Sequence, residues 1–354
     1  MDEGNFCKVR SILFPRNVLM GHGVIKDIPE MCKNFDLSGT ATIITGDKTK
    51  DVAADSISSL LKSSNYNVTT ISIGAATREN LHKTVDLAKD SHANFLIGVG
   101  GGSKIDLAKM AAKELGIEFI SVPTSASHDG IASGRASIKG PDGPISMEAK
   151  TPLGVVADTS IIVKAPFRLL VAGCADVISN ITAIKDWEYA ERLLGEEFSR
   201  SACAMALYTS EAIIESADLI KPGVEESVWI SLKPIIVSGV SMAVAGSSRP
   251  TSGSEHMFSH ALDMIAPGRA LHGEQCGVGC IMMMYLHGGN WMAIRDALIK
   301  LGAPTTAREL GITKEELLEA LTMAHKIRDR FTILGHQGLT YEAAERLAKI
   351  TKVI

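Results

Sequence analysis

Two histidines spaced four residues apart are the side chains of this chain best placed to do chemistry together. His256 and His260 lie in SEHMFSHAL, and their spacing puts both on one face of a helix. His272 follows in GRALHGEQ, and Asp176 lies in AGCADVISN near the start of a predicted helix. One carboxylate and two imidazoles suit zinc or ferrous iron, with coordination positions left open for a substrate oxygen. The alternative is a set of packed or surface histidines.

A second possible metal motif is the pair Cys276 and Cys280, which follows His272 closely. A structural zinc site built on this C-x-x-x-C pair is an alternative, but no second cysteine pair accompanies it. The segment between them is apolar and predicted helical, which favours two small buried residues. The six cysteines are scattered along the chain, as expected of reduced thiols without a disulfide framework.

A catalytic metal polarises a carbonyl or stabilises an alkoxide, and opposite a nicotinamide ring this chemistry becomes hydride transfer. A candidate dinucleotide turn is present, because Gly100-Gly101-Gly102-Ser103 follows the apolar run Phe95–Val99. Helical spacing continues through Lys104–Leu115. The glycines let an anion approach the backbone, and the helix start favours a diphosphate. The spacing is neither G-x-G-x-x-G nor a P-loop, so a tight packing turn is the alternative.

Strands alternating with helices position this turn. Strands are predicted at 9–19, 40–45, 68–73, 95–99 and 118–122, with helical segments between them. Such alternation indicates an open, mostly parallel sheet of the α/β class. Ligands of these sheets collect outside the carboxyl ends of the strands. The Gly46-Asp47 turn, the three glycines and Thr124–Ser127 would all lie there.

Two details refine this α/β part. After Ile73 the chain continues GAATR, with no acid to bind an adenosine ribose and one arginine, so the sequence permits NADP as well as NAD. Residues 131–138 and 145–156, around the turn at 140–144, are expected to form two strands of a hairpin.

The chain changes character near residue 165. We expect a dinucleotide-binding α/β domain at 1–165 and an all-α, metal- and substrate-binding domain at 166–354, with the active site in the cleft between them. Helical periodicity predicts helices at 175–189, 202–217, 225–245, 256–265, 276–286, 291–301, 314–330 and 341–349. Thr313 and Thr340 are plausible N-caps.

Composition excludes several classes of protein. The chain has 354 residues, 45% hydrophobic and 21% charged, with a net charge of −4, and it contains no dense basic cluster typical of nucleic-acid binding. The acidic start MDEGNFCKVR lacks the apolar core of a signal peptide, and the longest apolar stretch, 235–246, is too short to span a bilayer. We therefore expect a cytoplasmic protein that is not a membrane protein. The apolar helical half suggests a homo-oligomer, either dimer or octamer.

Five motifs in order resemble those of the archaeal sn-glycerol-1-phosphate dehydrogenases. These belong to the superfamily of iron-dependent alcohol dehydrogenases, glycerol dehydrogenase and dehydroquinate synthase. The motifs are GGGSKxxDxAK, PTSASHDG, ADxxSN, SGSEHxxxH and HGEQ, and they extend over nearly the whole chain without a departure. The resemblance implies a Rossmann-like N-terminal domain, a helical C-terminal domain, and one zinc ion between them.

The resemblance also implies roles for individual residues. The metal ligands would be Asp176, His256 and His272. Asp129, Asp176 and His260 would contact the substrate, with Asp129 and His260 in the catalytic machinery. The NAD or NADP would bind to Gly101, Gly102, Ser103, Lys104, Ile105, Asp106, Thr124, Ser125, Ala126, Ser127 and Ser133. A carboxylate such as Asp129 can orient substrate hydroxyls, although a simple Asx turn at Gly130 is the alternative. His260 can bind substrate or relay a proton, or it can simply pack.

The expected reaction is reversible reduction of dihydroxyacetone phosphate to sn-glycerol 1-phosphate, the backbone of archaeal membrane phospholipids. The substrate phosphate needs a cation, and Arg249 is the candidate, helped by the backbone of 251–254, with Arg168 and Arg269 as rivals. Other possibilities are a glycerol dehydrogenase, which needs no phosphate pocket, a dehydroquinate synthase, which needs more basic residues near the metal, and a non-catalytic nucleotide-binding protein without a metal.

Overall fold

A six-stranded sheet forms the core of the N-terminal half in the computed structural model, which describes residues 9, 11–140 and 143–354. The strands are ordered β1-β8-β5-β4-β2-β3, and every neighbouring pair is parallel. Their bounds are β1 (Asn17–Gly21), β2 (Thr40–Thr45), β3 (Asn67–Ser72), β4 (Phe95–Gly100), β5 (Glu118–Pro123) and β8 (Gly154–Asp158). The predicted parallel sheet is confirmed. The first strand, predicted over 9–19, begins only at Asn17.

Helices cover both faces of this sheet. Leu96 and Ile97 are successive residues of the wholly buried β4, yet they belong to different hydrophobic cores, as period-2 alternation requires. Ile28 and Ile57 pack on the Ile97 side. The elements involved are η1 (Val24–Asp27), α1 (Ile28–Asn34), α2 (Asp47–Thr49), the π-helical η2 (Lys50–Ala54), α3 (Asp55–Ser63), α4 (Arg78–Asp90) and α5 (Gly102–Leu115).

The expected hairpin is built differently from the prediction. A short helix, η3 (Asp129–Ile131), precedes β6 (Arg135–Gly140), which pairs antiparallel with β7 (Gly143–Glu148). The second predicted strand, 145–156, is wrong as one element, because β7 ends at Glu148 and only residues 154–156 belong to β8, which joins the parallel sheet. Residues 141 and 142 of the predicted turn lie outside the described residues.

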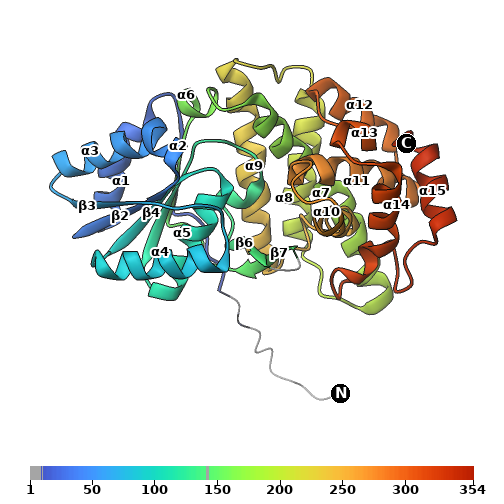
Figure 1. Cartoon of the computed structure of the whole chain (residues 1–354), viewed down its shortest axis with the longest axis horizontal. Helices are drawn as coiled ribbons and strands as arrows, with labels where there is room; N and C mark the ends of the chain where they lie inside the picture. The colour runs from blue at the N-terminus through green and yellow to red at the C-terminus, as the bar shows by residue number, and fades with distance from the viewer. Residues whose placement is uncertain (1–8, 10, 141–142) are drawn as a thin grey trace.

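The second half of the chain is helical, and Figure 1 shows it beside the sheet, running from green through yellow to red. Its elements are α6 (Thr159–Ile162), α7 (Phe167–Leu194), α8 (Arg200–Ser216), α9 (Glu225–Ala245), α10 (Ser254–Ile265), α11 (His272–Leu286), α12 (Trp291–Leu301), α13 (Ala307–Leu310), α14 (Lys314–Met323), η4 (Ala324–Lys326) and α15 (Tyr341–Ile350). The predicted α/β-then-α architecture is confirmed. The division at residue 165 stays a prediction.

Three helix boundaries differ from the sequence-based ones in ways that matter for the site. Helix α7 begins eight residues earlier than predicted, so Asp176 lies well inside it. Helix α11 begins at His272, which therefore occupies a helix start. The predicted helix 314–330 ends as α14 at Met323 and continues only as η4, so Arg328 and Arg330 lie in irregular chain.

Helices α7 and α9 are long and apolar enough to cross a membrane by length and composition. In the fold, however, 78% and 61% of their apolar windows are buried inside the protein. Their apolarity is therefore used for packing, as in the core helices of globular proteins. Thr313 and Thr340 cap α14 and α15 as predicted, each accepting a hydrogen bond from a backbone N–H.

Candidate active site

Asp176, His256 and His272 converge from three helices, α7, α10 and α11. Asp176 Oδ1 lies 3.6 Å from His256 Nε2 and 3.7 Å from His272 Nε2. The ligand atoms of these residues and of Cys276 all lie within 4.8 Å of one another. Asp176 Oδ1 is buried and has no hydrogen-bond partner in the described part of the chain. Such an orphaned oxygen facing two imidazoles is what a cation site requires.

Hydrogen bonds fix the tautomers of both histidines. Glu255 Oε1 accepts from His256 Nδ1 at 2.9 Å. Ser259 Oγ donates to Gln275 Oε1 at 2.6 Å, so at its 3.0 Å contact with His272 Nδ1 it accepts. Both Nδ1 atoms therefore carry the proton, and both Nε2 lone pairs face Asp176. Partners of this kind orient metal-ligating histidines.

Burial alone opposes charge in this cluster. It raises the pKa of the Asp176 carboxyl to about 7 and lowers that of the His256 imidazole well below its ordinary value. Both shifts follow from desolvation, which disfavours the charged form. A divalent cation would reverse them by interacting with the carboxylate and both lone pairs. The residues present therefore fit a metal ion.

The structure separates the two cysteines of the C-x-x-x-C pair. Cys276 Sγ lies 3.6 Å from His272 Nε2, at the edge of the cluster. Cys280, one turn further along α11, contacts the carbonyl of Ile178 instead. Burial raises the pKa of the Cys276 thiol well above its ordinary value. The pair is not a two-cysteine metal motif.

The loop that follows β5 brings Asp129 to the metal cluster, the name used for the side chains of Asp176, His256 and His272. Its backbone N–H donates to Asp176 Oδ2 at 3.4 Å, and its Oδ2 accepts from Ser238 Oγ of α9 at 2.9 Å. Burial, and next the charge of Asp176, raise the pKa of Asp129 to about 7. The expected neighbours Asp129 and Asp176 are thus in contact.

Two helical glycines allow this loop to sit so close. A Cβ on Gly239 of α9 would lie 2.3 Å from the carbonyl oxygen of Asp129. A Cβ on Gly173 of α7 would lie 2.1 Å from that of Ala126. Both distances are shorter than real Cβ atoms show, so any side chain larger than hydrogen would clash at these two positions. The backbones of α7 and α9 therefore pack directly against the loop.

His260 also lies at the cluster, with its ring centroid 5.7 Å from that of His272. Its Nε2 accepts from Arg328 Nη2 at 2.7 Å, since a guanidinium can only donate. The proton of His260 is therefore on Nδ1, a buried atom without a partner among the described residues. Arg328 was not singled out by sequence.

The glycine turn starts α5 as predicted. Gly101 is the N-cap, and no side chain among the described residues caps the helix start. The next two side chains already form hydrogen bonds with the protein backbone. Ser103 Oγ accepts from Ala76 N at 2.8 Å, and Lys104 Nζ donates to the Gly74 carbonyl. The backbone is thus what the turn offers to an anion.

Ile105 and Asp106 were predicted as cofactor contacts, but their side chains face inward. Ile105 is fully buried in the core. Asp106 Oδ2 accepts from Ser137 N at 3.1 Å, and its Oδ1 lies 3.5 Å from the buried Lys109 Nζ. Any contact of these two residues with a dinucleotide would involve their backbone.

The other predicted cofactor residues lie around the end of β5. Thr124 N donates to the Gly100 carbonyl at 3.0 Å, which ties this strand end to the glycine turn. Ser125 and Ala126 are buried, and Ser127 is partly exposed. Ser133 is buried beyond η3, where its Oγ accepts from Arg135 N at 3.3 Å.

His128 is a site residue that the sequence reasoning missed. Its Nδ1 accepts from Gly130 N at 2.8 Å, so its proton is on Nε2. A Cβ on Gly102 would lie 1.7 Å from that Nε2. The ring thus packs directly on the first residue of α5 and links the glycine turn to the Asp129 loop. Its place inside the PTSASHDG string was the available signal.

The expected phosphate cation, Arg249, is already engaged. Its Nε and Nη2 both donate to Glu196, the former at 2.6 Å, and its Nη1 donates to the Phe331 carbonyl at 2.8 Å. Its rival Arg168 forms a bidentate pair with Glu274 at 2.6 and 2.7 Å. The structure therefore does not support a phosphate role for either arginine.

The backbone helpers expected near Arg249 are engaged too. Gly253 N donates to Glu255 Oε1 at 2.6 Å, and Ser254 N donates to Asp186 Oδ2 at 2.6 Å. Arg269, the other rival, lines a surface pocket that also contains Arg168 and Glu274.

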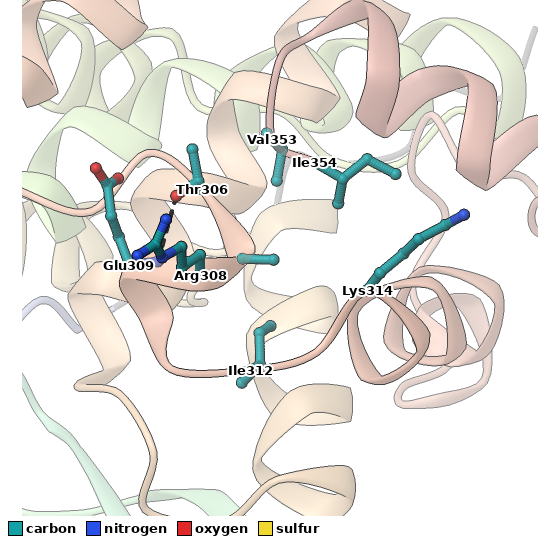
Figure 2. A pocket seen from close by; sticks show the side chains of 8 residues that line it. Thr306, Arg308, Glu309, Ile312, Lys314, Val353 and Ile354 are labelled. Atoms are coloured by element: carbon teal, nitrogen blue, oxygen red, sulfur yellow. Dashed lines mark hydrogen bonds between the residues drawn. The ribbon is translucent and has the colours of Figure 1, made fainter.

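A separate pocket of about 680 Å³ lies between α13, α14 and the C-terminal residues. Figure 2 shows Arg308 and Lys314 on opposite sides of it, with Ile312 and Val353 between. None of the residues lining it belongs to the metal cluster or the glycine turn. It plays no part in the site described here.

Comparison with known proteins agrees with this geometry. Residues 19–166 match the family model for iron-containing alcohol dehydrogenases. The chain is 56% identical over 346 residues to the glycerol-1-phosphate dehydrogenase [NAD(P)+] of Methanothermobacter thermautotrophicus, covering 98% of this chain and 99% of that protein. It is 55% identical to the Methanosarcina mazei protein of the same name, covering 96% of each.

A solved glycerol dehydrogenase from Schizosaccharomyces pombe has the same fold, with a TM-score of 0.81 at 22% identity, covering 98% of this chain and 91% of that one. This likeness concerns the fold, whereas identity above one half over nearly the full length shows the family. The chain belongs to the glycerol-1-phosphate dehydrogenases, among the iron-containing alcohol dehydrogenases.

Proposed function

We propose that this protein catalyses the reversible NAD(P)-dependent reduction of dihydroxyacetone phosphate to sn-glycerol 1-phosphate, with zinc as its metal. The convergence of Asp176 Oδ1 with the Nε2 atoms of His256 and His272, next to Asp129, carries the proposal. The named activity of relatives more than 50% identical supports it. The product would supply the glycerophosphate backbone of archaeal phospholipids. We propose a cytoplasmic homo-oligomer.

Asp176, His256 and His272 would hold the zinc, whose chemistry is to polarise a carbonyl oxygen and stabilise the negative charge that develops on it. Three protein ligands with imidazole and carboxylate donors suit a catalytic zinc site. Ferrous iron fits the same donors, so metal analysis of the purified protein decides between them.

The dinucleotide would bind on the turn of Gly101 and Gly102, supplying hydride from its nicotinamide ring. The uncapped start of α5 offers backbone N–H groups to the diphosphate, and the β5 end with Thr124 and Ser125 borders the turn. The 73–78 segment has no acid, so the site accommodates either NAD or NADP.

Asp129 and His260 would position the substrate. The Asp129 carboxyl, held through Ser238, can accept from a substrate hydroxyl and fix its orientation. The Nδ1 atom of His260 carries the proton and has no partner among the described residues. This N–H can therefore donate to a substrate oxygen. Asp176 borders both the metal and the substrate.

The test is NADH and NADPH oxidation by zinc-loaded protein with dihydroxyacetone phosphate, and with dihydroxyacetone in parallel. An enantiomer-specific enzyme then assigns the product as glycerol 1-phosphate or 3-phosphate. Activity confined to the phosphorylated ketone and yielding the 1-phosphate is expected. Activity on the free ketone alone would keep the fold and the metal but overturn the substrate.

A further inference from the structure

Two arginines that follow η4, Arg328 and Arg330, lie beside the candidate active site, and neither has a carboxylate partner in the part of the chain that the structure describes. Arg328 donates to His260 Nε2 at 2.7 Å and to Ser252 Oγ at 3.3 Å. Arg330 donates to the Ser252 carbonyl and, at 2.9 Å, to Ser248 Oγ. Within the described residues, all of their hydrogen-bond partners are neutral. Their charges are therefore not matched by contact with an anion.

The two carboxylates whose charges act on Arg330, those of Glu196 and Glu255, form hydrogen bonds with other residues. Glu196 forms both of its bonds with Arg249, and Glu255 accepts from His256. Burial and then the neighbouring cations lower the pKa of Arg330 to about 9. Holding two guanidinium groups together out of water is costly unless an anion joins them. Both arginines nevertheless keep partial exposure, so a ligand can reach them.

The segment that carries these arginines is firmly anchored. Ile333 N donates to the fully buried Asp186 Oδ1 at 2.7 Å, and the Phe331 carbonyl accepts from Arg249. Asp186 Oδ2 also accepts from Ser254 N and Ser254 Oγ at the start of α10, each at 2.6 Å. One carboxylate thus fixes both the arginine segment and the helix of His256 and His260. Donors held in this way are preorganised for a bound group.

The position relative to the metal cluster matches a small phosphorylated substrate. Arg328 contacts His260, whose ring lies next to that of the proposed ligand His272. An anion on Arg328 would therefore lie one side chain away from the metal-binding atoms. Guanidinium groups and hydroxyls are the donors that recognise a phosphate dianion.

We infer that Arg328 and Arg330, with the hydroxyls of Ser248 and Ser252, form the subsite for the phosphate of a phosphomonoester substrate. This inference rests on the proposed function for the identity of the ketone but not for the binding of phosphate. It replaces Arg249, which instead acts as a structural partner of Glu196.

The first test measures binding of inorganic phosphate by calorimetry to wild-type protein and to Arg328→Met and Arg330→Met variants, without ketone. Arg192→Met, which removes a surface arginine paired with Glu188, is the matched control. Phosphate is expected to bind wild type and the control, and binding should weaken roughly a hundredfold in each site variant because a charged hydrogen-bonding partner is lost. Absence of binding to wild type, or equal binding to all four proteins, would overturn the subsite.

The second test compares kcat/KM for dihydroxyacetone phosphate with kcat/KM for dihydroxyacetone. The ratio should fall about a hundredfold in Arg328→Met and stay at the wild-type value in Arg192→Met. An unchanged ratio refutes the inference. If Arg328→Met fails to fold, Arg328→Lys keeps the charge but loses the planar fork, and the ratio should fall less steeply. Failure of wild type to reduce either ketone would contradict the proposed function, while phosphate binding would still decide the subsite.

Discussion

The two parts of the candidate site, the glycine turn and the metal cluster, offer different groups to a ligand. The glycine turn at the start of α5 offers backbone, and the side chains of Ser103 and Lys104 are used within the protein. The metal cluster offers side chains from three helices, each oriented by a further residue such as Glu255 or Ser259. A site built from backbone groups should tolerate a change in the chemistry of nearby side chains, but not added side-chain volume. A site built from side chains should lose its function when the chemistry of one of them changes.

Removing a metal ligand should have the largest effect. His272→Ala deletes one of three converging donor atoms, and we expect zinc to be lost and kcat/KM to fall about a thousandfold or more. Zinc per subunit is measured by mass spectrometry alongside activity. Cys280→Ala on the same helix is the control, because its thiol contacts the Ile178 carbonyl and does not belong to the group of candidate ligands. A fully active His272→Ala protein would refute the zinc assignment.

Adding volume at the turn should be the next most damaging change. In Gly102→Ala the new Cβ would meet His128 Nε2 at 1.7 Å, so we expect NADH binding to weaken by roughly tenfold to a hundredfold. Gly101→Ala, whose Cβ would lie 3.3 Å from Ser125 Oγ, should cost much less. NADH fluorescence titration measures both.

The double variant Gly102→Ala with His128→Ala sharpens this prediction. Removing the ring relieves the clash, so part of the lost NADH affinity should return. If the double variant binds no better than Gly102→Ala, the close packing of His128 on α5 is not the reason for the glycine.

Loss of a supporting carboxylate should have a smaller effect than loss of a ligand. Glu255→Gln keeps the shape but weakens the bond to His256 Nδ1, and zinc affinity should fall by about tenfold to a hundredfold. Competition with a chelator measures the affinity. Glu188→Gln, on a partly exposed face of α7, is the control, and equal zinc affinity in both variants would contradict the role of Glu255.

The smallest effect on function is expected at Arg249. Arg249→Met breaks a bidentate pair with Glu196, whose side chain is one-third exposed, so unfolding by urea should become easier by about 1–3 kcal/mol. The ratio of kcat/KM for phosphorylated to free ketone should stay near wild type. A collapse of that ratio without loss of stability would restore Arg249 as the phosphate ligand.

Sequence predicted the parts of the site that lie within one contiguous string. The β4–turn–α5 unit and the shared face of His256 and His260 follow from local periodicity. Arg328 escaped notice because amphipathic spacing predicted a helix through residue 330, whereas the chain leaves helical geometry after η4. Its partner His260 is 68 residues away, and no local pattern indicates such a contact.

The same limit applies to Arg249 and to the hairpin. Arg249 precedes the ligand helix directly, but its partner Glu196 is 53 residues earlier in the chain. The run 145–156 is predicted as one strand, yet residues 154–156 belong to β8 and pair with β1 and β5. In each case a partner far away in the sequence determines the contacts that the residues make.

The close approach of Gly173 and Gly239 to the 126–129 loop ties the two halves of the candidate site together. The loop emerges from the sheet but is clamped between two helices of the other half. On its other side the loop is held to the sheet half, because Lys109 Nζ of α5 donates to the Gly130 carbonyl and His128 packs on Gly102. Asp129 is therefore fixed at once to the helices of the candidate metal ligands and to the helix of the glycine turn, so a shift of either half would change its position relative to the other.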